Sequence, residues 1–234
     1  MKKHFLIALL GIFAIGLFLL GSKNENPPHL LLVTIDTLRA DRLGGYGCKK
    51  GLTPNLDKLA DQGALFERAY AQSPLTLPSH TSILTGTNPT FHGVKDNSFY
   101  RLATSVPTLA TILKEYGYRT AAVVSGATVS RGKGLARGFS EYDDVPDTME
   151  EYAEHSRRIT ERIAEKSVEA ALKQIERFQE TPGPFFLWLH LFDPHADYNP
   201  PSSFREKFSD LYDAEVAYTD HCLGHLFGDR KSVV

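Results

Sequence analysis

The clearest indication of the fold class is His29-Leu30-Leu31-Leu32-Val33-Thr34-Ile35-Asp36, a continuous apolar run that ends in a carboxylate. Short apolar runs of this kind are typical of strands that are buried on both faces of a parallel sheet. The stretches 119–124 and 185–190 have the same character, and we predict them to be two further buried strands.

Helical patterns separate these strands. Thr53-Pro54 predicts the start of a helix, because threonine caps helices and proline suits their first turn, and Gly63 predicts its end. Further helices are expected at 78–86, 106–116, 148–180 and 208–227, and an extended segment at 64–71. Strands that alternate with helices, with little hairpin signal, predict an α/β fold whose mainly parallel sheet is flanked by helices.

The composition limits the classes of function. The 234 residues carry 26 Lys and Arg against 28 Asp and Glu, a net charge of −2, so no basic face for nucleic acid is implied. With 23% charged and 42% hydrophobic residues, a disordered, collagenous or multi-span membrane protein is excluded. Cys48 and Cys222 are too few for a disulfide scaffold or a thiolate zinc site, although one bridge between them stays open.

The amino-terminal residues 1–21 form a separate unit. Lys2 and Lys3 precede an uncharged apolar run from Phe5 to Gly21, which is the pattern of an export signal. The run is long for a signal core and at the short limit for a membrane span, so a cleaved signal peptide and a membrane anchor both stay open. We expect an exported protein, periplasmic or anchored to the inner membrane and facing outward, with residues 22–28 as a linker.

Polar side chains follow two of the predicted strands. Asp36 ends the first strand, and Asp193-Pro194-His195 follows the third. Ligands of open α/β sheets bind beyond the carboxyl ends of the strands, so these residues are candidates for a site. Taken singly, Asp36 and His195 are also compatible with capping roles. His190, inside the third strand, is predicted to be a buried core histidine.

The stretch Ser73-Pro74-Leu75-Thr76-Leu77-Pro78-Ser79-His80 contains the candidate nucleophile. Thr76 lies just before a helix that is predicted to begin near Pro78, where free backbone N–H groups and the helix dipole favour an anion. A threonine hydroxyl held there attacks phosphorus or sulfur when a metal ion lowers its pKa. By itself, the stretch also fits a Ser/Thr-rich helix cap.

Several motifs in series resemble the amino-terminal half of the sulfatase family, within the alkaline-phosphatase-like superfamily. They are LVTIDTLRAD (32–41), TPNLD (53–57), TLPSHTSILTG (76–86) and HGV (92–94), followed in order by 117–120, 184–187 and 193–195. The resemblance implies an alkaline-phosphatase-like fold and a metal-dependent hydrolase of sulfate or phosphate esters. It implies a small-molecule, glycan or lipid ester as substrate, and calcium as the metal, with magnesium, manganese or zinc as alternatives.

The family pattern implies roles for four residues. Asp36 matches the family's metal-binding aspartate, and Thr76 stands at the nucleophile position, where it would both hold the metal and attack. His195 matches the histidine that binds the ester or protonates the leaving group. His80, the remaining catalytic candidate, replaces an arginine that steadies the nucleophile and the metal. If Asp36 and Thr76 share a metal, their side chains converge at one edge of the sheet, with His195 facing the same cleft.

Departures from the family pattern keep alternatives open. Thr76 cannot be oxidised to formylglycine, so chemistry on phosphate or phosphonate esters, including phospho-group transfer through a threonine, is at least as plausible as sulfate hydrolysis. Thr37 replaces a second aspartate and His80 replaces the arginine, which also leaves open a catalytically silent sulfatase-like envelope protein.

The family completes its metal site on a later strand. Asp220-His221 resembles the required pair, but its apolar neighbours keep helical spacing, which predicts that both residues lie on a helix surface. We therefore expect residues 29–234 to be the amino-terminal part of a sulfatase-like catalytic domain, and the chain to be a fragment of a longer enzyme.

Overall fold

The computed structural model describes residues 27–144 and 161–229. Its centre is a parallel sheet with the strand order β1-β4-β2-β3. The strands are β1 (Leu30–Ile35), β2 (Arg119–Val124), β3 (Glu141–Asp143) and β4 (Phe185–Leu191). The predicted α/β class with a parallel sheet is confirmed, and each of the three predicted strands is present.

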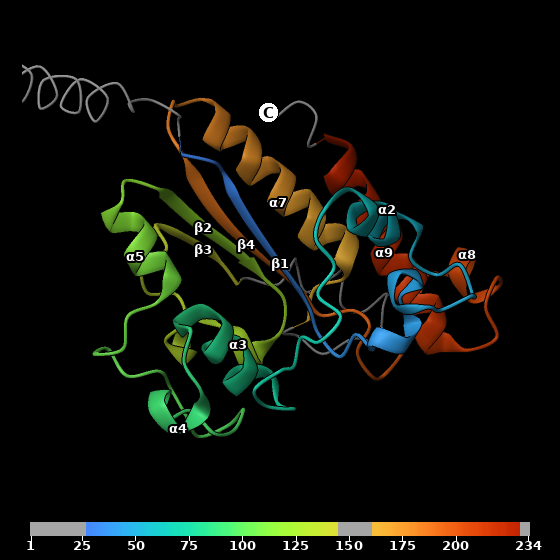
Figure 1. Ribbon diagram of the computed structural model, residues 1–234, viewed down its shortest axis with the longest axis horizontal. Helices are drawn as coiled ribbons and strands as arrows, with labels where there is room; N and C mark the ends of the chain where they lie inside the picture. Colours follow the sequence, from blue (N-terminus) through green and yellow to red (C-terminus); the bar gives the residue numbers. More distant parts are fainter. Residues whose placement is uncertain (1–26, 145–160, 230–234) are drawn as a thin grey trace, which may run out of the picture.

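Helices cover both faces of the sheet (Figure 1). The helices α7, α9 and α2 lie on one side, and α3, α4 and α5 lie on the other. Their bounds are α2 (Pro54–Gln62), α3 (Thr76–Thr85), α4 (Pro89–His92), α5 (Leu109–Glu115), α7 (Ala164–Gln179), α8 (Ser202–Arg205) and α9 (Leu211–Asp229). Short 3-10 turns occupy Ala40–Arg42, Gly44–Tyr46, Ala127–Val129 and Arg131–Lys133.

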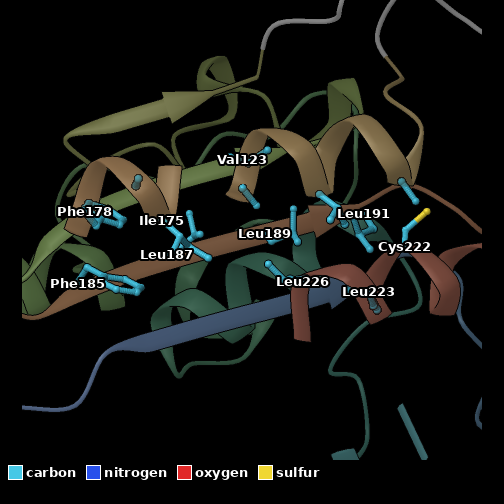
Figure 2. Packing of buried hydrophobic residues seen from close by; sticks show 14 of the residues in the cluster. Val123, Ile175, Phe178, Phe185, Leu187, Leu189, Leu191, Cys222, Leu223 and Leu226 are labelled. Carbon is cyan, nitrogen blue, oxygen red and sulfur yellow. The ribbon is translucent and has the colours of Figure 1, made fainter. Parts of the chain in front are cut away.

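Strand β4 supplies both hydrophobic cores, because side chains alternate between the two faces of a strand. Leu187 and Leu189 pack with α7 and α9 in the cluster that Figure 2 shows. Phe186 and Trp188 pack on the opposite face with residues of α3 and α5. Because β4 also pairs with a strand on each side, all seven of its residues are buried, which explains why every residue of the strand except His190 is apolar.

Helix α2 follows the prediction, with Thr53 as its N-cap, Pro54 at its first position and Gly63 at its end. Helix α3 begins at Thr76, two residues earlier than expected, so the candidate nucleophile lies inside the first turn. The stretch 64–71 is irregular, with a turn at 67–68, and the expected extended conformation is wrong. Its backbone pairs with no strand in the described part of the chain, and a strand needs such a partner.

The predicted helix over 148–180 is partly wrong. Residues 148–160 lie outside the described ranges, 161–163 are not helical, and α7 begins only at Ala164. Asp193, in the loop after β4, accepts the Ala164 N–H at 2.6 Å through its Oδ2 and so stabilises this helix start. Strand β3 was not predicted, because its three residues include a single apolar side chain, that of Tyr142.

Asp220 corrects another expectation. It lies in α9 as predicted, but it is only 1% exposed rather than on the helix surface. Its carboxylate accepts the N–H groups of Asn55 and Leu56, at 3.1 and 2.8 Å, at the start of α2. His221 is exposed, as predicted. The buried carboxylate of Asp220 thus joins α9 to α2. Helical periodicity within the sequence of α9 does not predict this contact.

Two further expectations concern the chain as a whole. Cys48 and Cys222 are both free thiols, so no bridge joins them. Within residues 27–144 and 161–229, the helices fall short of the length and apolar character that a membrane span requires. The expected export segment 1–21 lies outside these ranges, as does most of the expected linker.

Candidate active site

The side chains of Asp36 and Thr76 meet at the carboxyl end of the sheet. Asp36 directly follows β1, and its N–H donates to the Leu191 carbonyl oxygen at 3.0 Å. Thr76 is the first residue of α3, and its Oγ1 donates to Asp36 Oδ2 at 3.1 Å. Asp36 is buried and Thr76 is half-buried. The expected convergence of this carboxylate and this hydroxyl is therefore observed, across a sequence separation of 40 residues.

Thr37, the next residue, has a strained backbone. Its φ of 51° lies in the left-handed region, which is unfavourable for a β-branched side chain. Its N–H donates to Asp36 Oδ1 at 3.0 Å, and its Oγ1 donates to the Pro194 carbonyl oxygen, so the loops after β1 and β4 are joined. Strain of this kind persists where the surroundings enforce it, and it is concentrated at functional sites.

The N–H groups at the start of α3 are largely used within the protein. The Leu77 N–H donates to Asn97 Oδ1 at 2.8 Å, the Ser79 N–H donates to a backbone carbonyl at 3.0 Å, and Pro78 has no N–H. The expectation that free N–H groups follow Thr76 is therefore wrong at these positions. The reason is that the helix begins earlier than predicted and that a distant asparagine caps it.

His80 lies one helical turn after Thr76, in the interior. It is 5% exposed, and its Nδ1 lies 2.8 Å from the Thr76 carbonyl oxygen. Burial lowers the pKa of the imidazole, against the weaker opposing effects of the Thr76 carbonyl and the Asp36 charge. His80 therefore contacts the backbone of the candidate nucleophile without the fixed positive charge of an arginine.

His190 is fully buried, as expected of a core histidine. Its Nδ1 lies 3.1 Å from Thr34 Oγ1, and its ring centroid lies 4.5 Å from that of His80. Burial, and then the neighbouring His80, hold the pKa of His190 well below its usual value. Within the described residues its Nε2 has no hydrogen-bond partner, so only one of the two ring nitrogens is hydrogen-bonded.

His195 lies in the loop after β4 and is half-buried. Its ring stacks on Phe192, with the centroids 4.3 Å apart, and its Nδ1 lies 2.6 Å from the Ala196 carbonyl oxygen. In the described part of the chain, this hydrogen bond stays within the loop and does not reach Asp36 or Thr76. The role of His195 toward an ester remains a prediction.

The oxygen atoms of Asp36 and Thr76 are of the type that a hard divalent cation binds. Asp36 offers a carboxylate and Thr76 a hydroxyl, and such cations prefer oxygen ligands. Across the described residues there is no group of three or more His, Cys, Asp or Glu side chains that is able to hold a metal ion. A cation bound between Asp36 and Thr76 therefore needs further ligands than these two.

Two residues outside the set of predicted site residues support the start of α3. Asn97 accepts the Leu77 N–H, and Lys133 Nζ donates to the carbonyl oxygens of Asn97 and Ser98 at 2.7 and 3.0 Å. Capping patterns are recognised within a few positions of a helix start. No such local signal relates Asn97 or Lys133 to Thr76.

A pocket of about 800 Å³ lies beside α3, on the side lined by Ser79 and Ile83. Exposed aromatic rings, those of Tyr70 and Phe91, also line it. Thr76 is not among the residues that line this pocket, and Ser79 is the lining residue of α3 that is nearest to it in sequence.

Comparison with known proteins establishes the class of protein. The model that describes the sulfatase family matches residues 28–230. The chain therefore belongs to the sulfatase family.

Individual relatives agree with this assignment. Iduronate 2-sulfatase of Mus musculus is 29% identical over 236 residues, which cover 86% of this chain and 41% of that protein. The Δ4,5-hexuronate-2-O-sulfatase of Bacteroides thetaiotaomicron is 34% identical over 136 residues, covering 56% and 27% of the respective chains. The chain thus spans less than half the length of these relatives.

A solved structure has the same fold. The phosphonate monoester hydrolase of Agrobacterium radiobacter superposes with a TM-score of 0.73 at 18% identity, covering 88% of this chain and 60% of that one. This chain therefore shares the fold of that hydrolase over most of its length.

Proposed function

We propose that this chain carries the nucleophile of a metal-dependent hydrolase that acts on sulfate or phosphate esters. The observation that supports the proposal most directly is the hydrogen bond from Thr76 Oγ1 to the buried carboxylate of Asp36. It lies beyond the carboxyl ends of β1 and β4, where open α/β sheets bind their ligands. Membership of the sulfatase family supports the reaction class.

In the proposed mechanism, Asp36 directs the hydroxyl hydrogen of Thr76 toward its carboxylate and leaves the oxygen lone pairs free for attack. Thr76 Oγ1 forms a bond to phosphorus or sulfur as the bond to the ester oxygen breaks, and the hydroxyl proton of Thr76 passes to the Asp36 carboxylate. The leaving oxygen takes a proton, for which His195 is our candidate donor. Water then hydrolyses the ester of Thr76 and regenerates the hydroxyl.

Asp36 and Thr76 are the proposed ligands of a divalent cation, calcium first, with magnesium, manganese or zinc as alternatives. Such an ion, when bound, lowers the pKa of a coordinated hydroxyl. A threonine hydroxyl cannot become an aldehyde hydrate, so we propose phosphate or phosphonate esters as substrates alongside sulfate esters. The exposed rings of Tyr70 and Phe91 beside α3 suit an aryl or sugar ring of the ester.

The proposal is tested in the protein expressed from its natural coding sequence, with aryl sulfate, aryl phosphate and phosphonate monoester substrates. Thr76→Ala should abolish turnover, whereas Thr76→Ser should keep part of it, because a hydroxyl remains. Thr85→Ala makes the same chemical change at the last residue of α3 and serves as the matched control. Full activity in Thr76→Ala would show that the nucleophile lies elsewhere.

We also propose export, with residues 1–21 as a signal peptide or membrane anchor and 29–234 as the sulfatase-like catalytic domain. The apolar run behind two lysines supports this. Deletion of residues 1–21 should move the protein from the cell envelope to the cytoplasmic fraction. An unchanged distribution would contradict export through this segment.

A further inference from the structure

Two buried imidazoles behind Thr76 leave part of their hydrogen-bonding capacity unused. His80 and His190 are 5% and 0% exposed, their ring centroids lie 4.5 Å apart, and their planes meet at 73°. The Nε2 atom of each ring has no hydrogen-bond partner among the described residues. Unpaired buried polar atoms are costly and rare in native proteins, so two of them in adjacent rings call for an explanation.

The tautomer of His80 follows from its partner. Its Nδ1 lies 2.8 Å from the Thr76 carbonyl oxygen, and a carbonyl oxygen only accepts hydrogen bonds. Nδ1 must therefore donate. In a neutral imidazole the other nitrogen then has no hydrogen, so Nε2 of His80 is an acceptor.

The tautomer of His190 is assigned from a longer chain of contacts. The indole Nε1 of Trp188 only donates, and it donates to Thr34 Oγ1 at 3.1 Å. The hydroxyl hydrogen of Thr34 is then free to point at His190 Nδ1, which lies 3.1 Å away. A hydroxyl oxygen has two acceptor lone pairs, so this contact is compatible with either tautomer of His190. We assign the tautomer in which Nδ1 accepts the Thr34 hydrogen and Nε2 carries its own. The two unpaired Nε2 atoms are therefore one donor and one acceptor.

Burial supports the neutral state that these assignments need. His80 is 5% exposed and His190 is 0% exposed, and a charged imidazole is costly to place in such an interior. The ring centroids lie 4.5 Å apart, and a hydrogen bond between the two nitrogens requires a rotation of one ring or one bridging water.

We propose that His190 is a positioning residue for Thr76. Its Nε2–H donates to Nε2 of His80, directly or through one water, and Nδ1–H of His80 holds the Thr76 carbonyl. We call the series Trp188, Thr34, His190, His80 and Thr76 the histidine chain. It connects the centre of the sheet to the first turn of α3, whose N-cap residue makes no side-chain capping bond. The catalytic part of this inference rests on the proposed function of Thr76.

The first test is spectroscopic and does not depend on activity. In protein labelled with ¹⁵N-histidine, long-range proton–nitrogen spectra report which ring nitrogen carries the hydrogen. We expect Nδ1–H for His80 and Nε2–H for His190, assigned with His80→Asn and His190→Gln variants. Thr34→Val should remove the preference of His190 for Nε2–H, whereas Thr34→Ser, which keeps the hydroxyl, should preserve it. Nε2–H on His80, or Nδ1–H on His190 in the unmodified protein, would overturn the proposal.

The second test is kinetic and uses matched substitutions of His190. His190→Met removes the donor and should lower kcat about ten- to a hundred-fold with little change in KM, because a small displacement of the nucleophile suffices for such a loss. His190→Gln places an amide N–H near the position of Nε2–H and should recover part of the loss. Equal kcat values for folded His190→Met and folded His190→Gln would contradict the positioning role.

The two proposals fail separately. If Thr76→Ala keeps full activity, the nucleophile assignment is wrong. The hydrogen bonds of the histidine chain are then tested only by the tautomers of His80 and His190 in the spectra. If the spectra show the opposite tautomers while Thr76→Ala is inactive, the histidine chain is wrong and the nucleophile stands. If His190→Met does not fold, the Thr34→Val and Thr34→Ser pair decides the question by spectroscopy.

Discussion

At the scale of single residues, the carboxylate of Asp36 is held from two sides. One oxygen accepts the Thr37 N–H and the other accepts the Thr76 hydroxyl. The strained backbone of Thr37 makes the first of these contacts and also ties down the loop after β4. The position of Asp36 is therefore set before any ligand arrives, which favours catalysis by preorganisation.

Replacing Asp36 tests this role. Asp36→Asn keeps the shape but removes the negative charge, and we expect kcat/KM to fall at least about a hundred-fold, as for other groups that handle a reacting proton. The assay uses the same aryl esters. Asp61→Asn, on the exposed end of α2, makes the same change away from the site and should leave the rate unchanged. An active Asp36→Asn variant would contradict the proposed role of the carboxylate.

The two cysteines should differ in reactivity. Burial raises the pKa of the Cys222 thiol to about 12, and its side chain is 3% exposed, so little thiolate forms at pH 8. Cys48 is partly exposed. Iodoacetamide at pH 8 should alkylate Cys48 and spare Cys222 in the folded protein, and should modify both in urea, as measured by peptide mass spectrometry. Equal modification of the folded protein would contradict the burial of Cys222.

At the scale of elements, contacts between helices replace local caps. The Thr53 side chain does not cap α2, and its hydroxyl instead donates to Asp57. The N–H groups of Asn55 and Leu56 donate to the carboxylate of Asp220 in α9. This contact makes the start of α2 dependent on the packing of α9.

Asp220→Ala should therefore destabilise the fold. It leaves two backbone N–H groups at the start of α2 without their acceptor, at a cost of about 2–3 kcal/mol. The measurement is the urea midpoint followed by circular dichroism. His221→Ala, the next residue but exposed, should change stability by less than about 0.5 kcal/mol. Equal effects of the two changes would refute the capping role of Asp220.

Two glycines of α9 should respond in opposite ways to alanine. A Cβ at Gly224 would lie 2.8 Å from the Asn55 side chain, which is itself bonded to Asp220, whereas a Cβ at Gly228 would meet nothing within 4 Å. Gly228→Ala should stabilise the protein by up to about 1 kcal/mol through helix propensity. Gly224→Ala should lose that gain and lower the thermal midpoint. A rise in both midpoints would show that Asn55 moves aside freely.

At the scale of the whole molecule, β4 joins the two cores. Trp188, the one tryptophan of the chain, lies in the core beside α3, and Cys222 lies in the core beside α7. Neither core is complete without side chains of β4. Loss of either core therefore exposes a strand that the other core needs.

We accordingly expect a single cooperative unfolding transition. Trp188 fluorescence and the thiol reactivity of Cys222 should change at the same urea concentration, although they report on opposite faces of the sheet. Separate midpoints would show that the two cores unfold independently.

Local sequence patterns were enough to predict the three long strands, helix α2 with its first proline and terminal glycine, and Asp36 and Thr76 as candidate site residues. These features depend on local patterns: apolar runs, capping residues, and polar side chains at strand ends. The first residues of α3 and α7 could not be predicted from local patterns, because the contacts of Asn97 and Asp193 with those helix starts come from elsewhere in the chain. The tertiary structure also decided that Asp220 is buried and that His80 meets His190. Periodicity describes one element at a time, whereas these contacts arise from the packing of elements that are distant in sequence.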